Sequence, residues 1–292
     1  MKLRLFFPLL AGISLSASVS VAAVESEVPY LTLADGSKIP QLGCGVWELD
    51  GHEAYKSVTE AIKLGYRLID TAQYYRNESE TYQAVVDSGI PREEFYITTK
   101  LNPARGSSEK DIREALDGSL KNLGGKIDLV LIHWPFSNDE MAWRIMEEYV
   151  QAGKFTSIGV SNYSPEALKR IQTIARIKPV LNQVELHPYN SKYPAVAEYE
   201  KEGVKVEAWS PLGAGRQGLL KDRVIVDIAK KHGKSAAQVI LRWDLQRGII
   251  TIPRSKNPAH LKENISVMDF QLSDEEMRQI DALNCDDALW EI

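Results

Sequence analysis

Short apolar runs alternate along the chain with segments in which apolar residues recur every three or four positions. Ile127–Ile132 and Phe155–Val160 are typical of strands buried on both faces, as in parallel sheets. Ile112, Leu116 and Leu120 share one face of a predicted helix. The eight predicted strands cover residues 43–47, 66–69, 95–98, 127–132, 155–160, 180–184, 204–209 and 248–252. Strict alternation of strand and helix predicts a parallel sheet with right-handed crossovers.

The number of these units favours a closed barrel over an open sheet. Eight strand–helix units across ~250 residues are typical of a (β/α)8 TIM barrel, an α/β fold that forms one domain. A β-hairpin is predicted to precede it, with strands at residues 30–33 and 38–40 joined at Asp35–Gly36. Ser273 followed by three acidic residues predicts a capped last helix. We expect the barrel domain to span residues 24–292.

Residues 1–23 have the features of a signal peptide. Lys2 and Arg4 give a positive start, Leu5–Leu15 is largely apolar, and Val21-Ala22-Ala23 suits a cleavage site. This leader predicts entry into the secretory route or export, and a cytoplasmic location is the alternative. Its apolar run is shorter than the ~20 residues that span a bilayer, and no other run approaches that length. No transmembrane segment is expected in the mature chain.

Composition and charge exclude several classes of protein. The 292 residues are 44% hydrophobic and 26% charged, a balance that excludes a disordered chain. The 35 basic and 40 acidic residues give a net charge of −5, and without a basic block nucleic acid is not an expected partner. Cys44 and Cys285 are too few for a disulfide framework, and their spacing does not predict structural zinc.

Polar side chains follow the predicted strands at the end where such barrels build their active sites. The second, third and fourth strands lead into Asp70, Lys100 and His133, and Tyr75 follows Asp70 in the same loop. Later strand ends carry Ser161, Asn162, Asn182, Gln183, Glu185, Trp209, Ser210, Arg254 and Ser255. Each residue alone has a structural explanation, such as a buried ion pair or a core histidine. The convergence of four such groups on one barrel mouth favours a catalytic site.

These four side chains suit the reduction of a carbonyl group. A tyrosine with a pKa near 10 is a poor acid at neutral pH. A neighbouring Lys100 ammonium would lower that pKa, and Asp70 would hold Lys100 charged and oriented. His133 would donate a hydrogen bond that positions the carbonyl oxygen. Protein side chains supply no hydride, so we also predict a nicotinamide cofactor.

Six segments resemble those of the aldo-keto reductases and occur in the family's order. The first is GYRLIDTAQYYRNE at residues 65–78, which contains Asp70 and Tyr75. The others are IHWP at 132–135, GVSNY at 159–163, NQVELHPY at 182–189, WSPLG at 209–213, and IPRS at 252–255 followed by EN at 263–264. The similarity runs from about Leu31 to the C-terminus.

The resemblance implies an NAD(P)H-dependent aldo-keto reductase of the alcohol dehydrogenase (NADP+) type, which acts on CH–OH donors and reduces aldehydes and ketones to alcohols. It implies a catalytic tetrad of Asp70, Tyr75, Lys100 and His133, with Tyr75 as general acid/base. The implied cofactor contacts are Ser161, Asn162 and Gln183 at the nicotinamide carboxamide, Trp209 against the ring, Ser210 and Leu212 at the pyrophosphate, and Arg254, Ser255 and Asn264 at the adenosine end. The implied walls of the substrate pocket are Trp47, Trp134 and Tyr75. The resemblance implies a monomer with a small-molecule carbonyl substrate and no metal.

The chain departs from the family at positions that bear on the cofactor and the pocket. Arg254 stands where lysine is usual, and His260 where a second basic residue, commonly arginine, is usual. Arg254 keeps a charge and a two-pronged grip on phosphate, whereas neutral His260 offers less. We therefore expect NADPH, with NADH as a weaker cofactor. The short segment after Pro135 and the end of the chain at Ile292 predict an open pocket for varied small carbonyls.

Two other functions are compatible with parts of the sequence. A metal-dependent barrel hydrolase could use His133, Glu185 and His187. A redox-sensing or partner-binding subunit would keep the cofactor but have little turnover. The GxGxxG match at residues 213–218 has too little chain after it for a Rossmann domain, so we interpret it as a glycine-rich loop at the barrel mouth.

Three N-glycosylation sequons conflict with the predicted leader. Their acceptors are Asn77, Asn162 and Asn264. Since Asn162 and Asn264 are implied cofactor contacts, a glycan on either would block the cofactor site.

Overall fold

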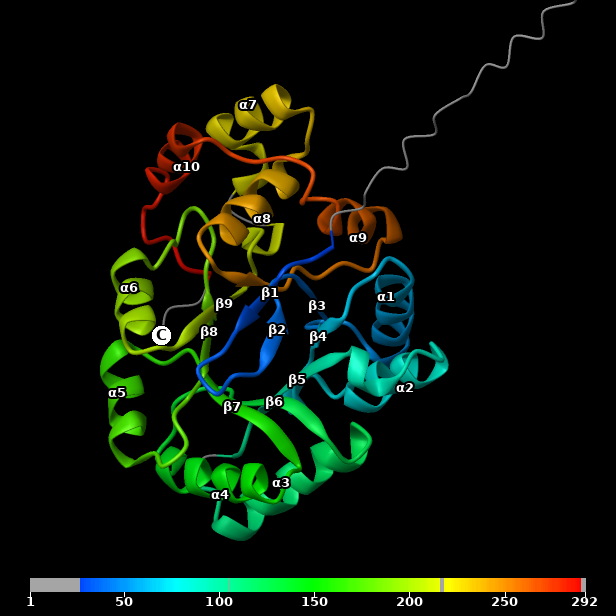
Figure 1. The fold of residues 1–292 in the computed structure, drawn as a ribbon, viewed down its shortest axis with the longest axis vertical. Helices are drawn as coiled ribbons and strands as arrows, with labels where there is room; N and C mark the ends of the chain where they lie inside the picture. The colour runs from blue at the N-terminus through cyan, green and yellow to red at the C-terminus, as the bar shows by residue number, and fades with distance from the viewer. Residues whose placement is uncertain (1–26, 105, 216–217, 290–292) are drawn as a thin grey trace, which may run out of the picture.

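The computed structural model describes residues 27–104, 106–215 and 218–289. Eight parallel strands follow one another around a ring in chain order (Figure 1). They are β3 (Gly43–Gly45), β4 (Leu68–Asp70), β5 (Tyr96–Leu101), β6 (Ile127–Ile132), β7 (Phe155–Ser161), β8 (Leu181–Glu185), β9 (Lys205–Trp209) and β10 (Ile250–Thr251). Parallel bridges Leu42–Thr251 and Gly45–Arg254 join the two ends of the sheet. The predicted (β/α)8 barrel is confirmed.

Helices surround the strands (Figure 1). They are α1 (Gly51–Lys63), α2 (Glu78–Asp87), α3 (Glu109–Asn122), α4 (Asp139–Gln151), α5 (Pro165–Ile174), α6 (Tyr193–Lys201), α7 (Arg223–His232), α8 (Ala236–Gln246), α9 (Pro258–Ile265) and α10 (Asp274–Asp281), with short 3-10 turns η1 (Gln73–Tyr75), η2 (Arg92–Glu94), η3 (Gly213–Gly215) and η4 (Leu219–Lys221). Ser108, Ser235 and Ser273 begin α3, α8 and α10 with capping boxes, so the predicted cap of the last helix is confirmed. α7 and α10 are additions to the simple alternation, and they pack on each other.

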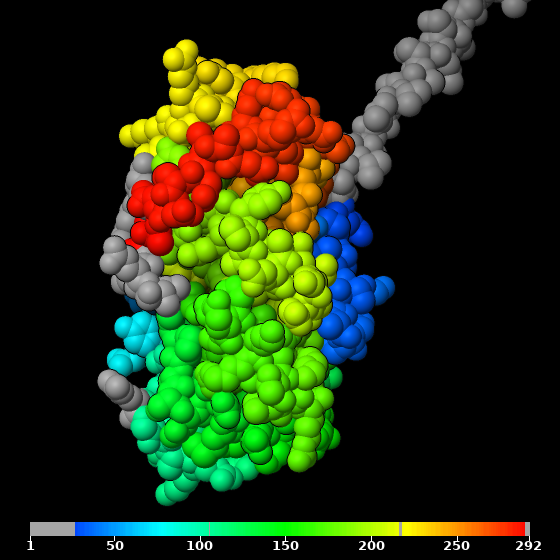
Figure 2. Space-filling view, turned by 90° about the vertical axis from the view of Figure 1, so that its left-hand side faces the viewer, coloured from blue at the N-terminus to red at the C-terminus, as the bar shows by residue number. Residues whose placement is uncertain are grey.

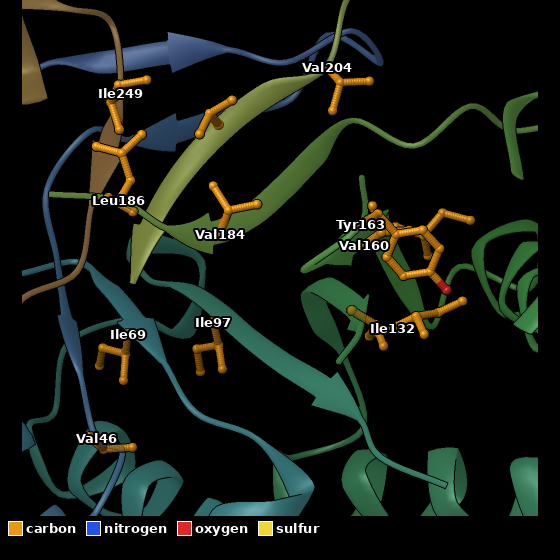
Figure 3. Packing of buried hydrophobic residues seen from close by; sticks show 14 of the residues in the cluster. Val46, Ile69, Ile97, Ile132, Val160, Tyr163, Val184, Leu186, Val204 and Ile249 are labelled. Atoms are coloured by element: carbon orange, nitrogen blue, oxygen red, sulfur yellow. The ribbon is translucent and has the colours of Figure 1, made fainter. Parts of the chain in front are cut away.

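Successive side chains of each strand point alternately toward the helices and into the barrel. The outward set includes Ile69, Ile97, Ile132, Val160 and Val184, which join the large apolar layer between strands and helices (Figure 3). The inward set forms a second apolar cluster that includes Leu68, Leu129, Leu131, Leu181 and Ile250. Gly159 lets β7 and β8 approach closely, because a Cβ at this residue would lie 2.6 Å from the Leu181 carbonyl oxygen.

The predicted hairpin closes one end of the barrel. Its strands, β1 (Tyr30–Thr32) and β2 (Lys38–Pro40), pair antiparallel. Leu33 and Ile39 are buried in the inward apolar cluster. The hairpin lies across the centre of the ring in Figure 1 and along one edge of the molecule in Figure 2. Because the hairpin fills the amino-terminal end, the carboxyl end is the open end of the barrel in the described part of the chain.

Some strands are shorter than the sequence predicts. β4 begins at Leu68 rather than at residue 66, because the Tyr66 amide still donates to the Ala61 carbonyl at the end of α1. β10 begins at Ile250 rather than at residue 248, because Gly248 has a φ of +74° and the Ile249 amide bonds back to Asp244. The predicted leader, residues 1–23, lies outside the described residues. No described helix is long and apolar enough to cross a membrane.

We expect Ile39→Ala to lower the free energy of unfolding by about 2–5 kcal/mol, because it leaves a cavity beneath the barrel. Denaturant unfolding of this variant measures the change. Val86→Ala, at a side chain that is 54% exposed, is the control and should change stability by less than about 0.5 kcal/mol. Equal stabilities of the two variants would show that the hairpin is not part of the core.

Candidate active site

A cavity of about 810 Å³ opens at the carboxyl ends of the strands. This volume is within the range of ligand-binding pockets. The residues implied by the resemblance that line it are Trp47, Asp70, Tyr75, His133, Trp134, Ser161, Asn162, Gln183, Trp209, Ser210, Leu212, Arg254 and Ser255. Lys100 and Asn264 are buried and do not line it. Lys100 instead contacts the hydroxyl of Tyr75, which lines the cavity.

Asp70, Lys100 and Tyr75 form a connected group beneath the cavity. The Lys100 ammonium donates to Asp70 Oδ1 at 2.5 Å, to the Thr71 carbonyl at 2.9 Å and to Tyr75 Oη at 3.2 Å. Asp70 and Lys100 are the inward residues at the ends of neighbouring strands, and Tyr75 is the last residue of η1. All three donor positions of the ammonium are used, so its orientation is fixed.

Burial dominates the electrostatics of this group. It raises the pKa of Tyr75, and the opposing effect of the Lys100 charge does not fully offset it. The sequence prediction that Lys100 lowers this pKa is thus correct in sign, but burial is the larger effect. Burial also disfavours the Lys100 cation, yet Asp70 and Tyr75 raise the pKa of Lys100 above its ordinary value. Lys100 is therefore charged and Tyr75 is a neutral phenol at physiological pH.

His133 lies beside this group as a neutral imidazole. Burial and then the Lys100 charge lower the pKa of His133 to about 3. Its ring meets that of Tyr75 edge-on, with centroids 5.8 Å apart. Asn162 Nδ2 holds the His133 carbonyl at 3.1 Å. A neutral imidazole offers one N–H, which suits a hydrogen bond to a carbonyl oxygen and excludes a permanent positive charge there.

The side chains of Asn162 and Gln183 differ in which of their amide atoms lack a hydrogen-bond partner. Asn162 Nδ2 donates to the His133 carbonyl and to Ser161 Oγ, while Asn162 Oδ1 accepts from Trp209 Nε1 at 2.8 Å. Ser161 Oγ donates to the Gln183 carbonyl. Of the three residues implied at the carboxamide, only Gln183 has a side-chain atom, Oε1, without a partner among the described residues. Its Nε2 donates to both Asp70 and Glu207.

Glu207 is the functional candidate that sequence reasoning missed. It lies in the middle of β9, points into the barrel and is fully buried. The available signal was a glutamate between the apolar residues Val206 and Ala208 of a predicted strand, two residues before Trp209 and therefore on the same face. Tyr74 and Asn102, which line the cavity, were missed as well.

A basic group lines another part of the cavity, on the segment between β10 and α9. It consists of Arg254 and Lys256 on that segment and of His260 in the first turn of α9. Arg254 bonds to Glu48 at 3.1 Å, and Lys256 bonds to Glu53 at 2.9 Å. Lys256 was not among the predicted residues. It adds a cation close to His260, where the resemblance implies a second basic residue.

The features that supported other functions are placed as follows. His187 and Glu185 are buried and contact each other at 3.0 Å. No group of three His, Cys, Asp or Glu side chains within the described ranges could hold a metal ion. Within the glycine-rich motif, Gly213–Gly215 forms η3 and lines the cavity in part, whereas residues 216 and 217 lie outside the described residues.

Comparisons with known proteins identify the family. Residues 41–285 match the model of the Aldo/keto reductase family. The chain therefore belongs to this family, whose members are oxidoreductases that act on carbonyl compounds.

Individual relatives share most of their length with this chain. The chain is 45% identical over 260 residues to the 9,11-endoperoxide prostaglandin H2 reductase of Trypanosoma cruzi, covering 88% of this chain and 92% of the relative. It is 43% identical over 260 residues to the glyoxal reductase of Bacillus subtilis, covering 88% and 93%. An aldo-keto reductase of Bombyx mori, solved in complex with NADP, is 34% identical with a TM-score of 0.84, covering 91% and 96%.

The acceptors of all three sequons are buried: Asn77, Asn162 and Asn264 are 0%, 4% and 2% exposed. Since the folded barrel has no room for a glycan at these positions, we expect the folded protein from a glycosylating host to carry none. Peptide mass spectrometry of the monodisperse fraction measures this. A glycan on any of the three in that fraction would contradict the packing described here.

Proposed function

We propose that this protein reduces aldehyde and ketone carbonyls to alcohols by hydride transfer from NADPH, as an enzyme of the alcohol dehydrogenase (NADP+) type. The observation that carries the proposal is the contact of Tyr75 with the buried Lys100–Asp70 pair at the cavity wall. A phenol at this position can give a proton to a ligand in the cavity, and family membership supports the reaction class.

The cavity fits a nicotinamide cofactor. Gln183 Oε1 is an acceptor for a carboxamide N–H, and Trp209 offers an aromatic face nearby. Arg254, Lys256 and His260 supply positive charge or donors for phosphate groups. Ser161, Asn162, Ser210, Leu212 and Ser255 are further proposed contacts, together with Asn264 from behind the cavity wall. NADH, which lacks the 2′-phosphate, would bind more weakly.

The protein's own groups position the carbonyl and move its proton. His133 donates a hydrogen bond to the carbonyl oxygen, and Tyr75 lies beside it to donate the proton that this oxygen gains. Bound NADPH supplies the hydride that the carbonyl carbon receives. Lys100 stabilises the phenolate that Tyr75 becomes, and Asp70 balances the Lys100 charge. In the reverse direction the same phenolate accepts the proton of an alcohol.

The substrate pocket has aromatic walls. Trp47, Tyr74 and Trp134 line the cavity, and Trp134 is 37% exposed at its mouth. None of the described residues after α10, which are residues 282–289, lines the cavity. This supports an open pocket for varied small carbonyls. The glyoxal reductase name of one relative makes α-dicarbonyls worthwhile first substrates. We propose that the protein is a monomer. We also propose that the leader predicted at residues 1–23 directs it to the secretory route or to export, with a cytoplasmic location as the alternative.

We expect Tyr75→Phe to lower kcat at least ~100-fold, because the variant loses the proton donor. The affinity for NADPH should stay within about twofold. NADPH oxidation is followed with a panel of aldehydes, α-dicarbonyls and ketones, and Tyr30→Phe, at an exposed tyrosine, is the matched control. Tight NADPH binding by the wild type without turnover of any carbonyl would instead favour a sensing or partner-binding subunit.

We expect Arg254→Gln to weaken NADPH binding about tenfold and to leave NADH binding almost unchanged, because only NADPH carries the 2′-phosphate. Fluorescence titration measures both affinities. Lys121→Gln on the exposed face of α3 is the control for a general change of charge. Equal losses for the two cofactors would show that Arg254 does not contact the 2′-phosphate.

A further inference from the structure

The Gln183 side chain is held between two carboxyl groups. Its Nε2 atom lies 2.8 Å from Asp70 Oδ2 and 2.9 Å from Glu207 Oε2. An amide nitrogen has two hydrogens, so both are used inside the protein. Reversing the amide would turn Oε1 toward the carboxylate of Asp70, which is paired with Lys100 and has no hydrogen to donate. Oε1 is therefore the only polar atom that Gln183 can offer to the cavity it lines.

Glu207 is buried in surroundings that do not favour its ionised form. Its neighbours across the sheet are Gln183 on β8 and Ile250 on β10. Its second oxygen, Oε1, is buried without a hydrogen-bond partner among the residues that the structure describes. The charged or titratable groups that face it are Asp70, Lys100 and Tyr75, and the single ammonium among them already binds Asp70. An ionised Glu207 would place a second negative charge beside Asp70 and would leave one of its two oxygens without a hydrogen bond.

We propose that Glu207 is a positioning residue that works as the protonated acid: it holds one amide hydrogen of Gln183 so that the amide oxygen faces the cofactor's carboxamide, and it adds no charge beside the Lys100–Asp70 pair. This inference rests on the proposed reductase function. Glu207 touches neither substrate nor cofactor, so its effect passes through Gln183 and Tyr75.

The pH dependence follows from the same arrangement. Burial and then the Asp70 charge raise the pKa of Glu207 to about 8. Below this value Glu207 is neutral, and above it the new negative charge raises the pKa of Tyr75 and makes the phenol a weaker acid. The wild-type kcat/KM for carbonyl reduction therefore falls as the pH rises through about 8.

Two substitutions separate the hydrogen bond from the charge. Glu207→Gln keeps an acceptor for Gln183 and is always neutral, so NADPH affinity should stay within about twofold and the loss of kcat/KM near pH 8 should disappear. Glu207→Leu removes the acceptor, so NADPH should bind about fivefold more weakly, the effect of one neutral hydrogen bond. Glu200→Gln, at an exposed glutamate of α6, is the matched control and should behave as the wild type.

Infrared spectroscopy of the cofactor-free protein at pH 6.5 tests the protonation directly. Burial raises the pKa of Asp244 to about 8 as well, so its carboxylic-acid absorbance should be present in every variant. We expect a further carboxylic-acid C=O band in the wild type that Glu207→Gln removes and Glu200→Gln leaves. The absence of such a band would overturn the proposal, and so would an equal loss of NADPH affinity in Glu207→Gln and Glu207→Leu. If Glu207→Leu does not fold, the infrared band and the pH profile of Glu207→Gln decide the question. Wild-type protein without carbonyl turnover would contradict the reductase function, whereas the infrared result tests Glu207 independently.

Discussion

The buried ion pair between Lys100 and Asp70 is the interaction on which the candidate active site depends. Their side chains are 0% and 3% exposed. Removing two charges from water costs several kcal/mol per ion, and mutual attraction seldom returns more than that. The surrounding groups reduce the cost, because Thr71, Tyr75 and Gln183 satisfy the remaining donors and acceptors. The pair is thus poorly explained by stability and well explained by the constant charge that it places beside the Tyr75 hydroxyl.

The inward side chains of the barrel are arranged in layers, with apolar residues below the polar ones. Along β4, Leu68 lies below Asp70, and along β8, Leu181 lies below Gln183. The two-residue period of a strand therefore places the reactive groups directly above the inward apolar cluster that the hairpin covers. Packing on one side of each polar residue and an open cavity on the other make the site rigid and accessible from one direction.

Features that are determined within one strand and the loop that follows it could be predicted from the sequence. The proximity of Asp70, Lys100 and His133 follows from strand ends, because the carboxyl end of every strand lies on the same face of the barrel, and Tyr75 follows Asp70 in the next turn. The link between Glu207 and Gln183 could not be predicted, since it depends on the register of β8 against β9. The engagement of Asn162 by Trp209 and the pairing of Glu48 with Arg254, 206 residues apart, depend on loop geometry in the same way. The dominance of burial over the Lys100 charge at Tyr75 is a balance of two energies, which residue types alone do not determine.

The Glu48–Arg254 ion pair makes the basic group of the cavity selective as well as attractive. Arg254 donates to Glu48 Oε2 through Nη2 and keeps its other N–H groups for an anion. The neighbouring carboxylate lowers the net positive charge that an arriving anion meets. A small free anion therefore gains little at Arg254. A large ligand with a phosphate also makes contacts elsewhere in the cavity, and these contacts add to what the partly neutralised guanidinium provides.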